Sequence, residues 1–182
     1  MKKAYIFLAE GFEIMETMTP VDILRRAGIQ ITTVSITEEK LVPSSHGIAV
    51  LADSTIDEVD FHDGDMLILP GGYPGYENLR KSEILKKLVL DYHSRKKIIA
   101  AICGAPTLLN DLNLLENIKF TCHQSVLENM PKENYLKEKV VVSKNIITSP
   151  GAGLSLDFSL TLAQLLTSDD MVKQIKKALE LV

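Results

Sequence analysis

Short, continuously apolar runs alternate with amphipathic segments along most of the chain. Residues 4–9, 66–69 and 98–102 are apolar over their whole length, which is typical of parallel strands buried on both faces. The intervening segments repeat apolar residues at helical spacing, as in the helix expected after Ser82, with Ile84, Leu85 and Val89 facing inward. This alternation predicts an α/β fold, a three-layer sandwich with a mainly parallel sheet.

The remaining segments continue the pattern less regularly. We expect a helix near residues 14–24 that ends before Gly28 and is either kinked or started late by Pro20. Further strands are expected at residues 29–36, 119–122, 140–142 and 146–148, a hairpin at 41–52, and helices at 106–112, 154–166 and after Ser168. No linker or repeat interrupts the pattern, so residues 1–182 are predicted to form one domain.

Composition and charge exclude several functional classes. Hydrophobic residues make up 46% and charged residues 24% of the chain, which is ordinary for a globular protein. The net charge of −4 gives no basic footprint for nucleic acid or for an anionic membrane. The two cysteines are too few for a disulfide framework. No apolar run is long enough for a signal peptide or a membrane span, so a cytoplasmic location is expected.

Cys103 is the most informative residue because it lies directly between a buried strand and a helix. Ala101, Gly104 and Ala105 flank it, which is the small-residue pattern of a nucleophile elbow with sulfur in place of oxygen. The helix that follows directs N–H groups toward the sulfur, so we expect a depressed thiol pKa. The alternative is a buried cysteine that acts as a small hydrophobe, and Cys122 is assigned to that class.

Other strand ends bring polar groups to the same edge of the sheet. Gly71 and Gly72 follow a buried strand, where paired glycines can direct N–H groups at an oxyanion or simply form a turn. Glu10, Glu13 and Glu16 follow the first strand, and a carboxyl group near a thiol can exchange protons with it. His123 follows a weaker strand. No histidine or cysteine spacing is typical of a metal site, so we expect neither a metal nor a cofactor.

Four motifs along the chain resemble a single known family. They are GFEIMETMTPVDILRRAG around Glu16, LILPGGYPG, IIAAICGAPTLL around Cys103, and ITSPGAGLSLDFSL. Together they resemble the ThiJ/PfpI family, in the DJ-one branch of protein deglycases and glutathione-independent glyoxalases. The resemblance covers essentially the whole chain and implies a flavodoxin-like fold. It also implies a homodimer, with Met15 and Met18 of the first helix near the interface.

The resemblance implies a role for each matched residue. Cys103 matches the family's reactive, oxidation-sensitive cysteine, and Glu16 matches the carboxylic acid that hydrogen-bonds it. His123 matches a histidine of the active site. The backbone donors that face the sulfur or an oxyanion are matched by Gly71, Gly72 and Gly104. His46 stands where relatives can carry arginine, so its role stays open.

These assignments predict a cofactor-free enzyme that acts on methylglyoxal, glyoxal or their early adducts with amines and thiols. Its products would be lactate or glycolate. The alternative is an oxidative-stress sensor or a redox-regulated chaperone that uses the same cysteine. Both functions use Cys103 and Glu16, so both stay open at this point. A protease is disfavoured because Gly104 stands where the protease-like branch has a histidine.

Overall fold

Seven strands form the central sheet of the protein, which a computed structural model describes over residues 1–182. They are β1 (Lys3–Leu8), β2 (Gln30–Ser35), β5 (Ser54–Thr55), β6 (Met66–Leu69), β7 (Ile98–Ile102), β8 (Val141–Ser143) and β9 (Ile146–Ser149). The strand order is β5-β2-β1-β6-β7-β9-β8, and every neighbouring pair is parallel except β8–β9. A separate hairpin joins β3 (Leu41–Pro43) to β4 (Ala49–Leu51).

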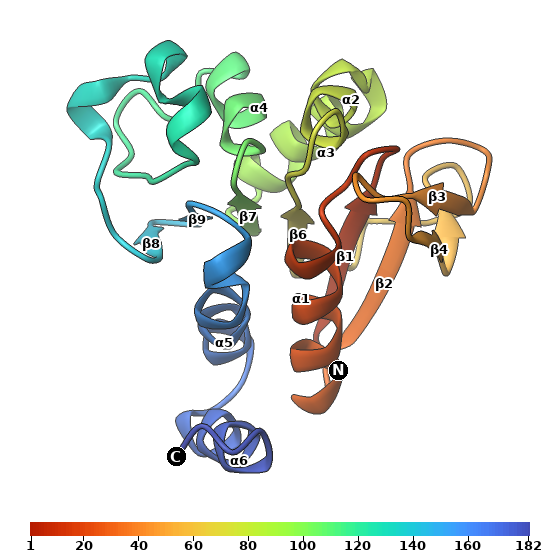
Figure 1. The fold of residues 1–182 in the computed structure, drawn as a ribbon, viewed down its shortest axis with the longest axis vertical. Helices are drawn as coiled ribbons and strands as arrows, with labels where there is room; N and C mark the ends of the chain where they lie inside the picture. Colours follow the sequence, from red (N-terminus) through yellow and green to blue (C-terminus); the bar gives the residue numbers. More distant parts are fainter.

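Helices cover both faces of this sheet (Figure 1). One face carries α1 (Ile14–Arg26), α5 (Ser155–Leu166) and α6 (Asp169–Ala178), and the other carries α2 (Gly75–Lys81), α3 (Glu83–Ser94) and α4 (Pro106–Asp111). Strand side chains alternate between two cores: Ile6 packs in the cluster of Leu24 and Phe158, whereas Phe7 packs in the cluster of Val89. The fold is therefore α/β and flavodoxin-like, as the sequence predicts.

Capping side chains set the starts of several helices, including α1, which carries Glu16. Ser82 caps α3 by accepting a hydrogen bond from an N–H in its first turn, and Ser168 does the same for α6. Glu13 caps α1, since its Oε2 accepts a hydrogen bond from the N–H of Glu16 at 2.8 Å. Helix α1 begins at Ile14 and runs through Pro20, so the expected late start is wrong. Early capping places Glu16 in the first turn, close to the end of β1.

Two expectations about elements are wrong. Residues 119–122 form no strand; Phe120 makes only an isolated bridge with Tyr135, and a side chain, Thr148 Oγ1, accepts the N–H of Thr121 at 2.9 Å. Ile84 was expected to face inward but is 51% exposed, because it lies beside rather than on the stripe that Leu85 and Val89 define. Two short 3-10 helices, Gln124–Asn129 and Lys132–Asn134, lie in the irregular region before β8, and a third, Ala152–Leu154, follows β9.

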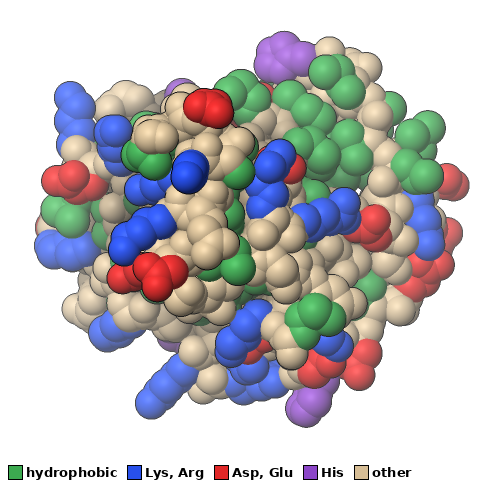
Figure 2. Space-filling view, turned by 90° about the horizontal axis from the view of Figure 1, so that it is seen from below, with side chains coloured by type: hydrophobic (Ala, Val, Ile, Leu, Met, Phe, Trp, Pro, Cys, Tyr) green, Lys and Arg blue, Asp and Glu red, His purple; other side chains and the backbone are tan.

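Charged groups of both signs are interspersed on the surface seen in Figure 2, and apolar side chains gather toward one side of it. Met15, in α1, is 51% exposed, whereas Met18 is half-buried and packs against the core. The expected contact between two copies through these residues stays a prediction. None of the helices combines the length and apolarity needed to cross a membrane.

Candidate active site

Cys103 lies in the turn directly after β7, with its backbone in the left-handed region. Its φ is 65°, a conformation that non-glycine residues rarely adopt and that clusters at functional sites. Two hydrogen bonds hold the turn: the Cys103 N–H donates to the carbonyl of Ser149 at 2.9 Å, and its carbonyl accepts from the N–H of His123 at 2.8 Å. The predicted nucleophile elbow is therefore present, fixed by β9 and by the loop that carries His123.

The carboxyl group of Glu16 is buried beside this cysteine. Glu16 is 1% exposed, and its Oε2 accepts a hydrogen bond from the N–H of Gly71 at 2.8 Å. The same carboxyl group is hydrogen-bonded to the Cys103 side chain and to the backbone of Ala152. The buried carboxyl group of Glu16 is thus held against the Cys103 thiol, where it can take up and release a proton.

Because Gly71 has no side chain, it leaves space for the Glu16 carboxyl group and the Cys103 thiol to come into contact. A Cβ at this position would lie 2.6 Å from both Cys103 Cβ and Glu16 Oε2, and 3.1 Å from Cys103 Sγ. The expectation that Gly71 donates to an oxyanion is wrong, because Glu16 accepts its N–H. The N–H groups that bind the Cys103 sulfur are those of Gly72 and Gly104. Two N–H groups that converge on one point in this way can stabilise a developing oxyanion.

The two acidic groups influence each other's protonation. Burial raises the pKa of Glu16 to about 7. Burial and the negative charge of Glu16 raise the pKa of Cys103 to about 12, against the lowering effect of the Gly72 and Gly104 N–H groups. The expected depressed thiol pKa is therefore wrong while Glu16 is ionised, and α4 has only six residues to supply a dipole. Proton uptake by Glu16 removes the second of these causes, whereas burial, the larger one, still raises the pKa of the Cys103 thiol.

The raised pKa of Glu16 predicts a pH-dependent contribution to stability. Because this pKa lies above the ordinary value of 4.5, the folded protein binds more protons than the unfolded chain between these values. The stabilisation is complete below the lower value and is lost as pH rises through about 7, which amounts to about 3 kcal/mol. Urea unfolding at about pH 5 and about pH 8 should show this loss in the wild type but not in Glu16→Gln. Equal losses in both proteins would contradict the assignment.

His123 lies at the same site, as expected, although no strand precedes it. Its Nδ1 is 2.8 Å from Ser125 Oγ, which orients the ring. A Cβ built on Gly151 would lie 3.6 Å from His123 Cδ2 and 4.0 Å from Glu16 Oε1. The imidazole ring and the carboxyl group therefore border the same space. His123 is exposed, so it can reach a small bound molecule.

Several residues that the sequence offered as site candidates lie outside the group formed by Cys103, Glu16 and His123. Glu10 is exposed and Glu13 caps α1, so only Glu16 of the three acids approaches the thiol. His46 is exposed in the β3–β4 turn, with Nδ1 3.0 Å from Ser45 Oγ. No group of three His, Cys, Asp or Glu side chains is arranged to hold a metal ion.

Tyr76 is a site residue that the sequence analysis missed. It lies in α2, which was not predicted, and its ring covers Gly104: a Cβ on Gly104 would lie 2.6 Å from Tyr76 Cδ1. Burial, and to a smaller extent the negative charges of Glu77 and Cys103, raise the pKa of its hydroxyl group. The glycine-rich turn after β6 is the signal that could have found it, because such turns often bring a helix over the sheet edge.

The two thiols should differ in reactivity because they differ in access. Burial raises the pKa of both thiols, that of Cys103 to about 12 and that of Cys122 to about 11, so ionisation does not favour Cys103. Cys122, however, is 1% exposed, whereas Cys103 is only half-buried, and iodoacetamide must reach the sulfur to react. At neutral pH iodoacetamide should therefore modify Cys103 first, by at least about tenfold in rate. Peptide mass mapping over time measures both rates. Equal rates, or faster modification of Cys122, would contradict this prediction.

A flavodoxin-like sheet with a cysteine elbow and a buried carboxyl group defines a class of α/β proteins with a nucleophilic cysteine. Residues 2–165 match the model of the DJ-1/PfpI family, and the chain belongs to this family. It is 34% identical over 182 residues to "Parkinson disease protein 7 homolog" of Danio rerio, covering 98% of this chain and 96% of that protein.

Two further comparisons agree with this assignment. The chain is 32% identical to "Protein dj-1beta" of Drosophila melanogaster, over 98% of this chain and 96% of that protein. The solved structure "Toxoplasma gondii DJ-1, oxidized" superposes with a TM-score of 0.94 at 30% identity, covering 98% of both chains. The four motifs that indicated the family thus correspond to similarity over the whole fold.

Proposed function

We propose that the protein is a cofactor-free, cysteine-dependent glyoxalase and deglycase. Its substrates are methylglyoxal and glyoxal, free or as early adducts with amines and thiols, and its products are lactate and glycolate. The observation that carries this proposal is the contact between Cys103 and a buried Glu16 whose pKa is raised to about 7. Such a carboxyl group is suited to both accept and donate a proton near neutral pH.

In the first step the sulfur of Cys103 bonds to the aldehyde carbon. Glu16 takes the thiol proton, the electron pair of the carbonyl double bond moves to oxygen, and Glu16 returns the proton to that oxygen. The product is a hemithioacetal. The N–H groups of Gly72 and Gly104, which face the sulfur, are placed to stabilise the transient oxyanion.

In the second step a proton moves between the two substrate carbons. His123 removes the proton from the carbon bonded to sulfur while the neighbouring carbonyl oxygen is protonated, which gives an enediol. A proton then returns to the neighbouring carbon, and the hydroxyl group on the sulfur-bound carbon loses its proton and becomes the thioester carbonyl. The result is a lactoyl thioester formed without an external oxidant, since one carbon is oxidised as the other is reduced. Water then cleaves the thioester, releasing lactate and restoring the thiol of Cys103. The net reaction adds one water to methylglyoxal.

An oxidative-stress sensor is the second candidate, and the same contact supports it. Two peroxide equivalents would convert the Cys103 thiolate to the sulfinate, releasing two waters. A protonated Glu16 can donate a hydrogen bond to a sulfinate oxygen. The solved relative from Toxoplasma gondii is described as oxidized. A chaperone role has no comparable observation in this structure.

The test of the proposed enzyme is lactate formation from methylglyoxal without glutathione. Wild-type protein and the Cys122→Ser control should form lactate, and Cys103→Ala should reduce the rate to the uncatalysed background. Proton NMR distinguishes lactate from unreacted aldehyde. Lactate formation by Cys103→Ala at the wild-type rate would overturn the proposal.

A further inference from the structure

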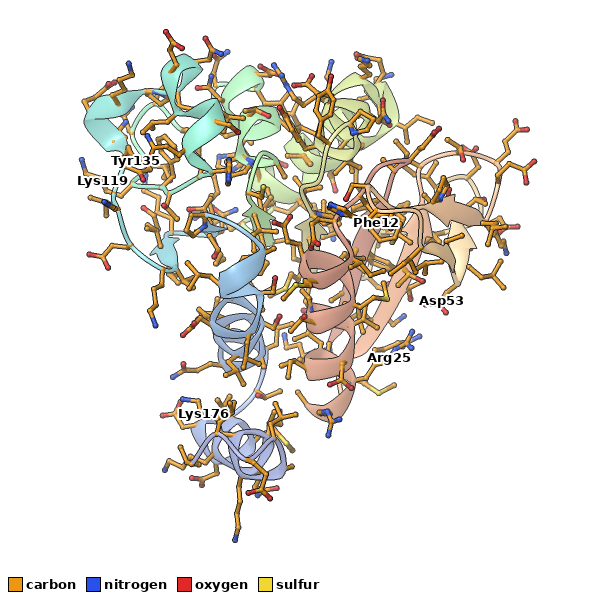
Figure 3. The ribbon with its side chains drawn as sticks, in the orientation of Figure 1. Phe12, Arg25, Asp53, Lys119, Tyr135 and Lys176 are labelled. Atoms are coloured by element: carbon orange, nitrogen blue, oxygen red, sulfur yellow. The ribbon has the colours of Figure 1, made fainter.

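A pocket of about 380 Å³ has His123 in its wall, whereas neither Cys103 nor Glu16 lines it. Its volume falls within the range of roughly 300–1,000 Å³ that small-molecule sites occupy. Its wall includes Thr121, Cys122, His123, Tyr135, Lys137 and Lys139. Figure 3 places Tyr135 on the side of the molecule where β8 and β9 lie. Because Cys103 does not line this pocket, the pocket is available to a part of the substrate other than the carbons bonded to sulfur.

Backbone contacts join the pocket to the nucleophile. The carbonyl of Ser149 accepts the N–H of Cys103 at 2.9 Å, and the Ser149 hydroxyl group donates to the carbonyl of Lys139 at 2.8 Å. On the opposite wall, His123 donates its N–H to the carbonyl of Cys103 at 2.8 Å. Both walls of the pocket are thus held in position by residues bonded to the elbow.

The polar groups of the pocket suit an anion. Two lysines, Lys137 and Lys139, and one acid, Glu138, line the wall, so the local charge is opposite in sign to the net charge of −4 of the chain. Lys137 takes part in none of the ion pairs of the structure, and Lys139 has only a long one, 3.8 Å from Asp157. The buried hydroxyl group of Thr121 in the same wall has no hydrogen-bond partner.

We propose that this pocket is a binding site for a carboxylate on the carrier part of the substrate. The carrier is the thiol or amine to which the aldehyde carbons are attached, and Lys137 and Lys139 bind its carboxylate while His123 borders the reacting carbons. A role of this site in catalysis rests on the proposed function, whereas binding of the carboxylate does not. Adducts of acidic thiols and amino acids then bind better than adducts of neutral carriers.

The test uses an unreactive analogue of such an adduct. In 3-(acetonylthio)propionate a thioether joins three carbons to a carboxylate-bearing carrier, and its methyl ester is the neutral match. Calorimetry with Cys103→Ser protein at low salt should show that the acid binds about fivefold more tightly than the ester, the upper range for a solvent-exposed ion pair. The preference should weaken with added salt, and the His123 ring signals should shift in NMR spectra.

Charge-neutral variants locate the effect. The double variant Lys137→Gln/Lys139→Gln should lose the preference for the acid, whereas Lys144→Gln, in the exposed β8–β9 turn, should keep it. Equal binding of acid and ester, or a preference that survives in the double variant, would overturn the site. A retained preference without turnover of methylglyoxal by the wild type would support the site and overturn only the proposed function.

Discussion

Replacement of Glu16 with glutamine is expected to lower kcat for methylglyoxal by about 100-fold to 10,000-fold, the range of a general acid–base group. Glutamine keeps an oxygen that can accept the N–H of Gly71, but it cannot take the thiol proton. KM should change little, since no substrate contact is removed. The wild-type profile of kcat against pH should show an inflection near 7, the pKa of Glu16, and the variant should lack it.

Glu10→Gln is the matched control for this experiment. Glu10 lies in the same acidic segment, but it is exposed and precedes the Glu13 cap of α1. Its kcat and its pH profile should equal those of the wild type. Wild-type turnover by a folded Glu16→Gln protein would show that Glu16 has only a structural role.

Replacement of Gly71 with alanine should be nearly as damaging, although it adds a single methyl group. The new Cβ would lie 2.6 Å from Cys103 Cβ and 2.6 Å from Glu16 Oε2, so the thiol and carboxyl groups must move apart. A displacement of about 1 Å at reacting groups can cost about 100-fold in rate. Overpacking should also lower the free energy of unfolding by about 1–3 kcal/mol. Turnover and urea unfolding measure the two effects.

Gly153→Ala separates a specific clash from a general glycine effect. Apart from its chain neighbours, no atom lies within 4 Å of a Cβ at Gly153, and this glycine lies in the 3-10 helix Ala152–Leu154 that Gly151 precedes. Its turnover and stability should match the wild type. Equal activities of Gly71→Ala and Gly153→Ala would contradict the packing described for the site.

The central strands could be predicted because a strand that is buried on both faces of the sheet has a continuous apolar run in the sequence. Strands β1, β6 and β7 each coincide with such a run. Residues 119–122 show a weaker pattern, Lys-Phe-Thr-Cys, and form no strand, because Phe120 is buried by packing against Tyr135 and the adjoining core instead of by pairing. Local sequence does not distinguish these two ways of burying an apolar side chain.

The site was predictable where it depends on local chain geometry and less so where distant segments meet. The elbow of Cys103 requires small neighbours in sequence, and these are visible. The role of Gly71 depends on a contact with Glu16, 55 residues away, so its N–H was assigned to the wrong acceptor. The thiol pKa was misjudged for the same reason, since burial and the charge of Glu16 outweigh a short helix.

Lactate released per protein chain, measured alongside the intact mass of the protein, tests the central claim most directly. An enzyme restores the Cys103 thiol in every cycle, whereas a sensor is altered by its signal. Without glutathione, fully reduced protein should release many lactate molecules per chain. Graded peroxide should stop turnover in proportion to the fraction of chains that carry the Cys103 sulfinate. Less than one lactate per chain from fully reduced protein would contradict the account.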